Sequence, residues 1–356
     1  MDVIVRLERV TKKFGDVVAV DDVSLDIGRG EFVTLLGPSG SGKTTTLMMI
    51  AGFELPSSGL IFIDGEMVVY KPPHKRNIGM AFQSYALFPH MTIFDNIAFP
   101  LRMRRRPKEE IGREVDRALA LVKLPDFGHR YPRQLSGGQQ QRIALARSLV
   151  YNPPVLLMDE PLGALDKKLR EHMQLEIKHL HQSLGITVVY VTHDQSEALT
   201  MSDRIALMNE GRIEQIGAPA DLYEKPANKF VANFIGDTNL IPEASVVGER
   251  EGRLELVCPS GLRLATTCHT LSSSPSLSLA IRPERIAILG PEEKRDQVFQ
   301  GVVGEVVFLG NSYKYRILLE GKETVTVTIS NDRLREILKV GDQVLVGWDD
   351  EDVKLL

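Results

Sequence analysis

The fold is decided by one stretch of the chain, which has the pattern G-x-x-x-x-G-K-[ST]: Gly37-Pro38-Ser39-Gly40-Ser41-Gly42-Lys43-Thr44. The apolar residues 31–36 before it predict a buried strand, and residues 45–51 after it predict a helix that ends at Gly52. A strand, a glycine-rich turn and a helix in this order form a phosphate-binding loop. The glycines let backbone amides approach a polyphosphate, and the helix N-terminus adds partial positive charge. We therefore expect this segment to bind a nucleoside triphosphate.

Two side chains of this loop have distinct expected roles. Lys43 can reach the β- and γ-phosphates, and the hydroxyl of Thr44 can bind Mg²⁺. The alternative is an ordinary glycine turn with a solvated lysine, which the flanking strand and helix argue against. The residues expected to surround the phosphates are Ser39, Gly40, Ser41, Gly42, Lys43, Thr44 and Thr45.

The composition is that of a globular protein with two domains. The chain has 356 residues, of which 43% are hydrophobic and 25% charged, and its net charge is −4. It contains neither a membrane-length apolar run nor a signal peptide at its start. Its two cysteines, Cys258 and Cys268, fit no metal-binding spacing and are expected to be structural. We expect a cytosolic protein whose membrane role, if any, depends on partners.

Two further strands are expected to end in polar residues beside the phosphate loop. The apolar run that starts at Val155 leads into Asp159 and Glu160, and the run 186–191 is followed shortly by His193. Because ligands bind at the carboxyl ends of parallel strands, Asp159 could hold Mg²⁺ and Glu160 could accept a proton from an attacking water. His193 could contact the γ-phosphate. The alternatives are an acidic turn and a structural histidine.

Residues from about 90 to 150 carry helical rather than strand patterns and predict an all-helical insert in the α/β core. Within it, Ser136 and Gln139 have the spacing of a capping box, with Ser136 as the N-cap. Gly137 and Gly138 leave the first helical turn open, at a cost of about 0.8–1 kcal/mol each relative to alanine. Binding of an anion would offset this cost; otherwise the segment is only a well-capped helix.

Beyond Ile241 the pattern changes to short alternating runs, which predict antiparallel strands at 302–309, 314–319 and 324–329. This part has 14 basic and 18 acidic residues and a serine-rich loop at 272–276. An acidic β-domain without a clustered aromatic face argues against nucleic-acid binding. We expect a nucleotide-binding domain at 1–237 and a regulatory or protein-interaction domain at 238–356.

All these motifs, in this order, resemble the ATP-binding subunit of an ABC transporter over the whole chain. Phe14 corresponds to the adenine-stacking aromatic residue, Gln83 to the Q-loop, residues 135–139 to the LSGGQ signature and Asp166 to the D-loop. Gly163 departs from the serine that is more common in the D-loop. The resemblance implies a P-loop NTPase, with a RecA-like α/β core, an antiparallel β-subdomain and a helical subdomain. An all-β, OB-like domain of the TOBE type follows it, with its Arg282-Pro283-Glu284 motif.

The same resemblance implies ATP and Mg²⁺ as cofactors and a head-to-tail homodimer. It implies catalytic roles for Glu160, His193, Lys43 and Gln83, and metal binding by Thr44, Gln83 and Asp159. In such a dimer the signature of one copy closes on the ATP of the other through Ser136, Gly137, Gly138 and Gln139. The further implied partners are two transmembrane permease subunits and, indirectly, an extracytoplasmic solute-binding protein. The expected location is the cytoplasmic face of the inner (plasma) membrane, as a peripheral subunit.

Within the importers, residues 82–92, 184–219 and 234–237 are similar to the spermidine/putrescine class. Ferric-iron, sulfate and sugar importers share much of this pattern, so these solutes remain open. A soluble ABC ATPase outside transport would have two cassettes or a long coiled coil. A GTP switch would need Asn-Lys-x-Asp, and residues 228–231 fail at the fourth position. A non-catalytic scaffold is expected to lose Lys43 or Glu160, and both are present.

Overall fold

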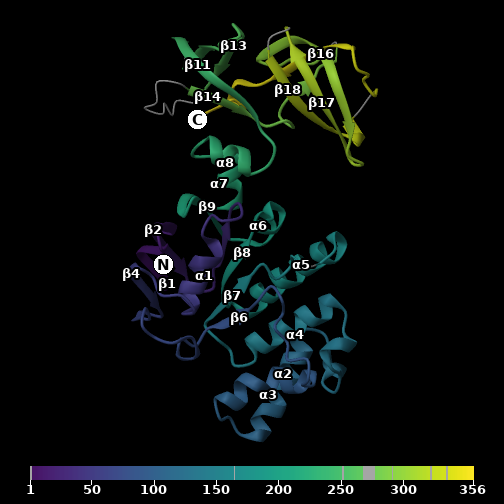
Figure 1. The fold of residues 1–356 in the computed structure, drawn as a ribbon. Helices are drawn as coiled ribbons and strands as arrows, with labels where there is room; N and C mark the ends of the chain where they lie inside the picture. Colours follow the sequence, from purple (N-terminus) through teal and green to yellow (C-terminus); the bar gives the residue numbers. More distant parts are fainter. Residues whose placement is uncertain are drawn as a thin grey trace. The chain divides into compact units, whose positions relative to one another are not determined.

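The computed structural model divides the chain into two compact units, Met1–Ala220 and Asp221–Leu356 (Figure 1). The structure describes residues 2–163, 165–250, 252–267, 277–290, 292–320, 323–333 and 336–356. Cys268 and the serine-rich loop at 272–276 lie outside the described residues. Cys258 is buried, as expected of a structural cysteine, and burial raises its pKa to about 11.

The first unit is built on a central sheet with the strand order β10-β9-β3-β8-β7-β6. Its neighbouring strands run parallel except for the β9–β10 pair. Every residue of β3 and β8 is buried, because other elements cover both faces of the sheet. The strands are β3 (Phe32–Leu36), β6 (Gly79–Ala81), β7 (Val155–Asp159), β8 (Thr187–Thr192), β9 (Arg204–Asn209) and β10 (Arg212–Gly217).

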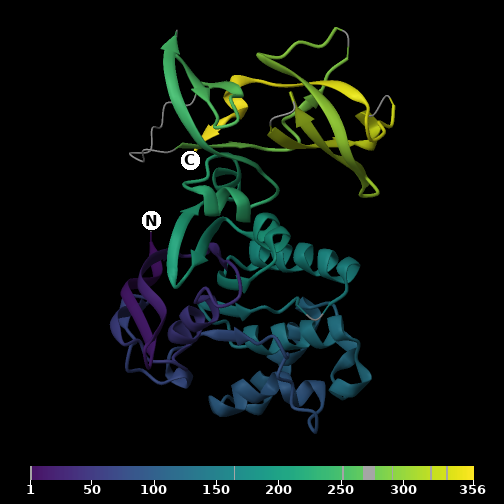
Figure 2. The same ribbon diagram turned by 45° about the horizontal axis from the view of Figure 1, so that its top comes forward.

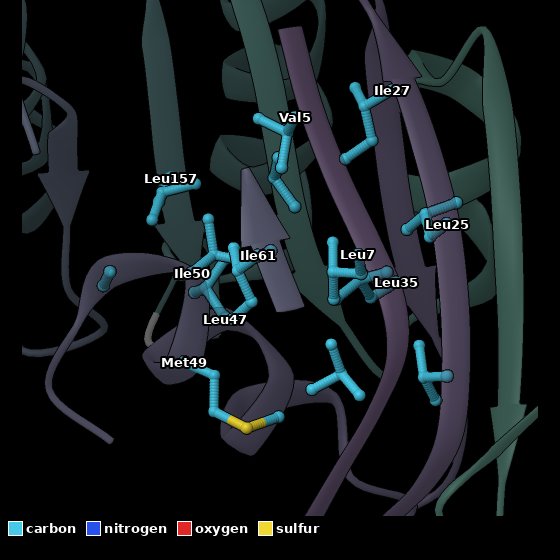
Figure 3. Packing of buried hydrophobic residues seen from close by; sticks show 14 of the residues in the cluster. Val5, Leu7, Leu25, Ile27, Leu35, Leu47, Met49, Ile50, Ile61 and Leu157 are labelled. Carbon is cyan, nitrogen blue, oxygen red and sulfur yellow. The ribbon is translucent and has the colours of Figure 1, made fainter. Parts of the chain in front are cut away.

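An antiparallel sheet and helix α1 (Lys43–Ala51) cover one face of the central sheet. In Figure 3, Leu35 and Leu157 of the central sheet pack with Leu47 of α1 and with residues of β1, β2 and β4. The antiparallel sheet has the order β2-β1-β4-β5. Its strands are β1 (Val3–Phe14), β2 (Val17–Gly28), β4 (Ser58–Ile63) and β5 (Glu66–Met67). Strand β1 continues to Phe14, because β1 and β2 form a hairpin that pairs Phe14 with Val17.

Helices α4 (Gly137–Leu149), α5 (Lys167–Leu184) and α6 (Gln195–Met201) cover the other face. They pack against the alternate residues of the same strands, such as Phe32, Leu156 and Tyr190. The strands expected at 31–36, from Val155 and at 186–191 are confirmed as β3, β7 and β8, but α6 was not predicted. Its N-cap is Asp194, whose carboxylate accepts from the amides of Ser196 and Glu197. An acidic residue followed by glutamate three positions later is a start signal that the sequence carries.

The expected helical insert is confirmed and has its own apolar core. It contains α2 (Ile93–Met103) and α3 (Lys108–Leu121), which pack with α4. Thr92 caps α2 by accepting a hydrogen bond from the amide of Asp95, and Pro107 precedes α3. In the described part of the chain, no helix combines the length and the apolarity of a membrane span.

The described residues of the second unit include two α-helices and form two antiparallel sheets (Figure 2). The inner faces of the two sheets share one apolar core. The helices are α7 (Pro219–Glu224), whose first two residues are still counted in the first unit, and α8 (Lys229–Phe234). The first sheet contains β13 (Arg263–Thr266), β12 (Arg253–Val257), β11 (Asn239–Arg250), β14 (Leu277–Ile281) and β20 (Lys354–Leu355). The second contains β15 (Ala287–Ile288), β19 (Gln343–Trp348), β16 (Gln297–Phe308), β17 (Ser312–Leu319) and β18 (Glu323–Ser330). The three strands predicted beyond residue 300 lie in β16, β17 and β18.

The second unit begins before the expected boundary at residue 238 because Arg282 ties the short helices to the sheets. Arg282 is only 7% exposed and directly follows β14. Its guanidinium donates to the backbone oxygens of Tyr223 (2.8 Å), Ala232 (2.9 Å) and Asp237 (3.0 Å). It also lies 4.0 Å from the centre of the Tyr223 ring. We infer that α7 and α8 fold with the β-domain.

Replacing Arg282 by alanine should destabilise this unit by about 2–4 kcal/mol, because one buried and two partly buried carbonyl groups lose their donor. The measurement is denaturant unfolding, in which the two units can unfold in separate transitions. Arg285→Ala is the control, since the Arg285 ion pair with Glu224 is half-exposed and is worth less than about 1 kcal/mol. Equal stability of the two variants would show that Arg282 does not hold the helices.

Candidate active site

The loop between β3 and α1 needs glycine at two positions for steric reasons. A Cβ on Gly37 would lie 2.2 Å from the carbonyl oxygen of Met208, and one on Gly42 would lie 2.5 Å from that of Ala19. Gly42 also has φ +96°, a backbone conformation that residues with a side chain rarely adopt. No side chain caps the start of α1, so its first amides stay available to an anion. The loop has the form expected of a phosphate cradle.

Lys43 is a buried cation inside this loop, with 5% of its surface exposed. Its Nζ donates to the carbonyl oxygen of Pro38 (2.7 Å) and, more weakly, to Ser41 Oγ (3.4 Å). Burial lowers the pKa of Lys43, although the charges of Glu160 and Asp159 act in the opposite direction. A polyphosphate would compensate this desolvated ammonium group.

Asp159, the last residue of β7, meets Thr44 of α1. Thr44 Oγ1 donates to Asp159 Oδ1 over 3.1 Å. Burial raises the pKa of Asp159, and the hydrogen bond from Thr44 opposes this change. A hydroxyl and a carboxylate oxygen at this distance suit a hard cation such as Mg²⁺. Among the described residues no three His, Cys, Asp or Glu side chains form a metal cluster, so a cation here would need nucleotide or water oxygens as further ligands.

Glu160 and His193 follow neighbouring parallel strands, β7 and β8, and their side chains meet. His193 Nδ1 lies 3.0 Å from Glu160 Oε1, at hydrogen-bond distance. The Glu160 amide donates to the carbonyl oxygen of Val191 (3.0 Å), and its φ is +42°. A residue with a side chain in the left-handed region is strained, and such strain is frequent at functional sites. The carboxylate is therefore held at the strand end beside the phosphate loop.

Sequence reasoning missed a polar network behind the histidine. Glu197 of α6 is 2% exposed and accepts hydrogen bonds from the hydroxyls of Tyr190 (2.8 Å) and Thr192 (2.7 Å). Burial raises the pKa of Glu197. Arg170 of α5 donates to Asp194, the N-cap of the same helix, over 3.0 Å. This network holds the end of β8, and with it the backbone of the histidine.

Gln83 and the D-loop lie next to each other. Gln83 follows β6 and is exposed, and its Nε2 would be 3.6 Å from a Cβ placed on Gly163. The serine that is more common at this position would contact the glutamine. Asp166 accepts a hydrogen bond from the Leu169 amide (3.0 Å) and caps α5. Asp166 thus has a structural role within its own chain besides the expected one at the nucleotide.

Phe14 ends β1 and is 48% exposed, so it is not a core residue. Lys12 Nζ lies 4.6 Å from the centre of its ring, where the cation faces the π-system. The ring is thus accessible for stacking on a base.

The signature turn is a capping box, as predicted. The Gln139 amide donates to Ser136 Oγ (3.4 Å), and the Ser136 amide donates to Gln139 Oε1 (3.0 Å). Gly138 has a second reason to be glycine that the sequence did not reveal. A Cβ there would lie 3.2 Å from the side chain of Leu169 on α5, which is tighter than usual packing. Close packing and an open first turn therefore both favour glycine.

The structure brings Lys43, Thr44, Asp159, Glu160 and His193 together at one edge of the sheet. The signature residues 136–139 do not join this group, because α4 and α1 pack on opposite faces of the central sheet. In the described parts of the chain, no hydrogen bond or ion pair joins residues 136–139 to residues 37–45. The phosphate loop and the signature turn are therefore separate from each other within one copy.

Comparisons with family models and known proteins agree with this architecture. Residues 20–163 match the ABC transporter family and residues 279–356 match the TOBE domain. One similar solved structure is described as the dimeric structure of a post-hydrolysis state of the ATP-binding cassette MJ0796 bound to ADP and Pi. Its sequence is 36% identical to this chain, and the TM-score is 0.54. That match covers 61% of this chain and 99% of the other. This chain is also 30% identical to cbiO1 from Clostridium perfringens, with a TM-score of 0.59. The match covers 63% of this chain and 92% of the cbiO1 chain.

Several curated proteins are similar over nearly the whole length. The spermidine/putrescine import ATP-binding protein PotA of Rubrobacter xylanophilus is 52% identical over 98% of this chain and 92% of its own. The protein of the same name from Nitrosomonas europaea is 46% identical over 99% of both chains. This chain therefore belongs to the ABC transporter family, as an ATP-binding subunit that hydrolyses ATP and carries a C-terminal TOBE domain.

Proposed function

We propose that this chain energises the import of a polyamine, spermidine or putrescine, through a membrane permease. The observation that carries the proposal is the 52% identity to an import ATP-binding protein over both the cassette and the TOBE domain. The permease, rather than this subunit, selects the solute and sets the direction. Ferric iron, sulfate and sugars therefore remain alternatives that an uptake experiment distinguishes.

We propose the following roles at the nucleotide. Lys43 and the amides of the loop bind the phosphates of ATP, and Phe14 stacks on the adenine. Thr44, Asp159 and Gln83 hold Mg²⁺, which would neutralise phosphate charge when bound with ATP. The donor set fits the ion, because these ligands are hard oxygens and two of them lie 3.1 Å apart.

Glu160 serves as the general base in this proposal. It accepts a proton from the water that attacks the γ-phosphate, and His193, 3.0 Å from it, orients the carboxylate and contacts the γ-phosphate. The positive φ of Glu160 supports this role, because strained backbone of this kind is frequent at functional sites. A base fixed before ATP arrives loses little entropy when the reaction starts.

We further propose that two copies of the chain bind ATP head to tail. Ser136, Gly137, Gly138 and Gln139 of one copy would complete the phosphate site of the other, because these residues do not reach the site of their own copy. ATP then favours the closed dimer through contacts that only this state provides. The dimeric cassette with ADP and Pi, 36% identical to this chain, supports the arrangement.

Residues 85–89 would contact the permease at the cytoplasmic face of the plasma membrane, with the chain bound there as a peripheral subunit. Phe88 is a large apolar residue of this segment, and the centre of its ring lies 4.9 Å from that of Phe99. A solute-binding protein on the far side of the membrane would act on the subunit only through the permease.

Glu160→Gln should bind ATP and dimerise, but hydrolyse it at least about 100-fold more slowly, because the general base is lost. Light scattering with ATP measures the dimer, and phosphate release measures turnover. Glu210→Gln is a matched control, since Glu210 also has a positive φ, at +46°, and lies in an exposed turn. A Glu160→Gln protein that stays monomeric with ATP and hydrolyses it at the wild-type rate would refute the proposed mechanism.

Phe88→Ala should uncouple transport from hydrolysis. We expect ATPase activity of the isolated subunit to remain within about twofold. Solute uptake by the assembled transporter should fall about tenfold or more, the effect of about 1.4 kcal/mol of lost contact energy. Phosphate release by the isolated subunit and solute uptake by vesicles that contain the assembled transporter measure the two quantities. Equal losses of the two activities would place Phe88 outside the permease contact.

The solute is tested by uptake in vesicles that contain the complete transporter and its solute-binding protein. Labelled spermidine should enter in an ATP-dependent manner, and unlabelled putrescine should compete with it. Sulfate, ferric iron and maltose should neither enter nor compete. ATP-driven uptake of one of these without uptake of spermidine would overturn the polyamine assignment, whereas no uptake of any solute would argue against a transport role.

A further inference from the structure

The segment that follows Gln83 contains two consecutive residues in an unusual backbone conformation. Tyr85 has φ +59° and Ala86 has φ +48°, although neither is glycine. Such residues persist only where the surrounding structure holds them. The segment that leads to Phe88 must therefore have specific support.

Arg147 of helix α4 provides this support. Its Nη1 donates to the carbonyl oxygen of Ala86 over 2.7 Å, and its Nη2 donates to that of Tyr85 over 2.8 Å. The guanidinium carbon also lies 5.8 Å from the centre of the Phe88 ring. A rigid guanidinium fork can bind two neighbouring carbonyl oxygens at once, whereas a lysine ammonium cannot match both in this way.

Tyr85 adds a contact to the beginning of the same helix. Its hydroxyl is buried and has no hydrogen-bond partner among the described residues. It would lie 4.0 Å from a Cβ placed on Gly137, in the first turn of α4. The segment thus lies near the signature end of α4 and is hydrogen-bonded to Arg147, about three turns further along the helix.

Asn96 of α2 holds the other end of the segment. Asn96 is fully buried, accepts a hydrogen bond from the Phe88 amide (2.8 Å), and donates to the carbonyl oxygens of Phe88 (3.1 Å) and Thr92 (2.9 Å). Both supports, Arg147 and Asn96, belong to the helical subdomain.

The core holds only the beginning of the segment. Ala81 is paired with Met158 in the central sheet, and the Tyr85 amide donates to the carbonyl oxygen of Phe82 over 3.0 Å. Residues 83 and 84 lie between the part joined to the core and the part held by the helices. Motion of the helical subdomain relative to the core should therefore bend the chain here and carry Phe88 along.

We propose that Arg147 is a positioning residue that fixes the Phe88 segment to the signature helix. When α4 closes on ATP of the partner copy, Arg147 transmits this displacement to the permease-facing segment. The inference rests on the proposed permease contact of Phe88. It adds a named link within one chain between the helix that senses ATP and the surface that moves the permease.

The test compares Arg147→Gln, Arg147→Lys and a control, Arg102→Gln, in the complete transporter in vesicles. Arg102 belongs to the same subdomain, but its ion pair with Asp95 is largely exposed. Three quantities are measured: ATP hydrolysis by the subunit alone, its stimulation by spermidine-loaded binding protein, and amide hydrogen exchange in residues 84–91.

With Arg147→Gln, hydrolysis by the subunit alone should stay within about twofold, while stimulation falls by about threefold to thirtyfold, the range of residues that carry coupling. Exchange should become faster in residues 84–91 but not in α4. Arg147→Lys should give stimulation and exchange rates between those of the wild type and Arg147→Gln. If Arg147→Gln fails to fold, the lysine variant alone tests the inference. Arg102→Gln should behave as the wild type.

Normal stimulation in both Arg147 variants overturns the inference if Phe88→Ala still loses it, because the permease contact then works without Arg147. If Phe88→Ala also keeps full stimulation, the proposed permease contact itself is wrong. The inference would also be overturned if Arg147→Lys lost hydrolysis by the subunit alone and stimulation to the same extent. Arg147 would then serve only the stability of the cassette.

Discussion

The site depends on one geometric constraint, the parallel alignment of β3, β7 and β8. The carboxyl ends of parallel strands meet at one edge, so the residues that follow them come together whatever their distance along the chain. Leu36 pairs with Thr192, and Asp159 pairs with Val191. This register alone brings the phosphate loop, the acidic pair and His193 to the same place. The helices and the second sheet serve this edge by burying both faces of the strands.

The electrostatics of this edge are those of an incomplete site. Burial lowers the pKa of Lys43 and raises the pKa of Asp159, so both charged forms are disfavoured without a ligand. ATP with its cation would supply the missing opposite charges, and closure by a second copy would supply the remaining phosphate contacts. The binding energy of ATP can therefore drive a change in assembly, as a ligand that prefers one state does.

Loops without regular structure are held by side chains that bind backbone groups. Arg147 and Asn96 bind the segment around Phe88, and Arg282 binds the chain between α7 and β11. Each of these side chains is at least partly buried, where unpaired polar groups are unfavourable and paired ones hold a single geometry. They determine which loops move with which element.

The sequence by itself determined the phosphate loop, the alternation of strands and helices, the capping box at Ser136 and the acidic strand end at Asp159. These features depend on local spacing, which is read directly from neighbouring residues. Only the tertiary structure decided that His193 meets Glu160, that Gly138 faces α5 and that Arg147 supports the Phe88 segment. Such contacts join residues far apart in the chain, and no local pattern encodes which distant partner a buried polar side chain will find.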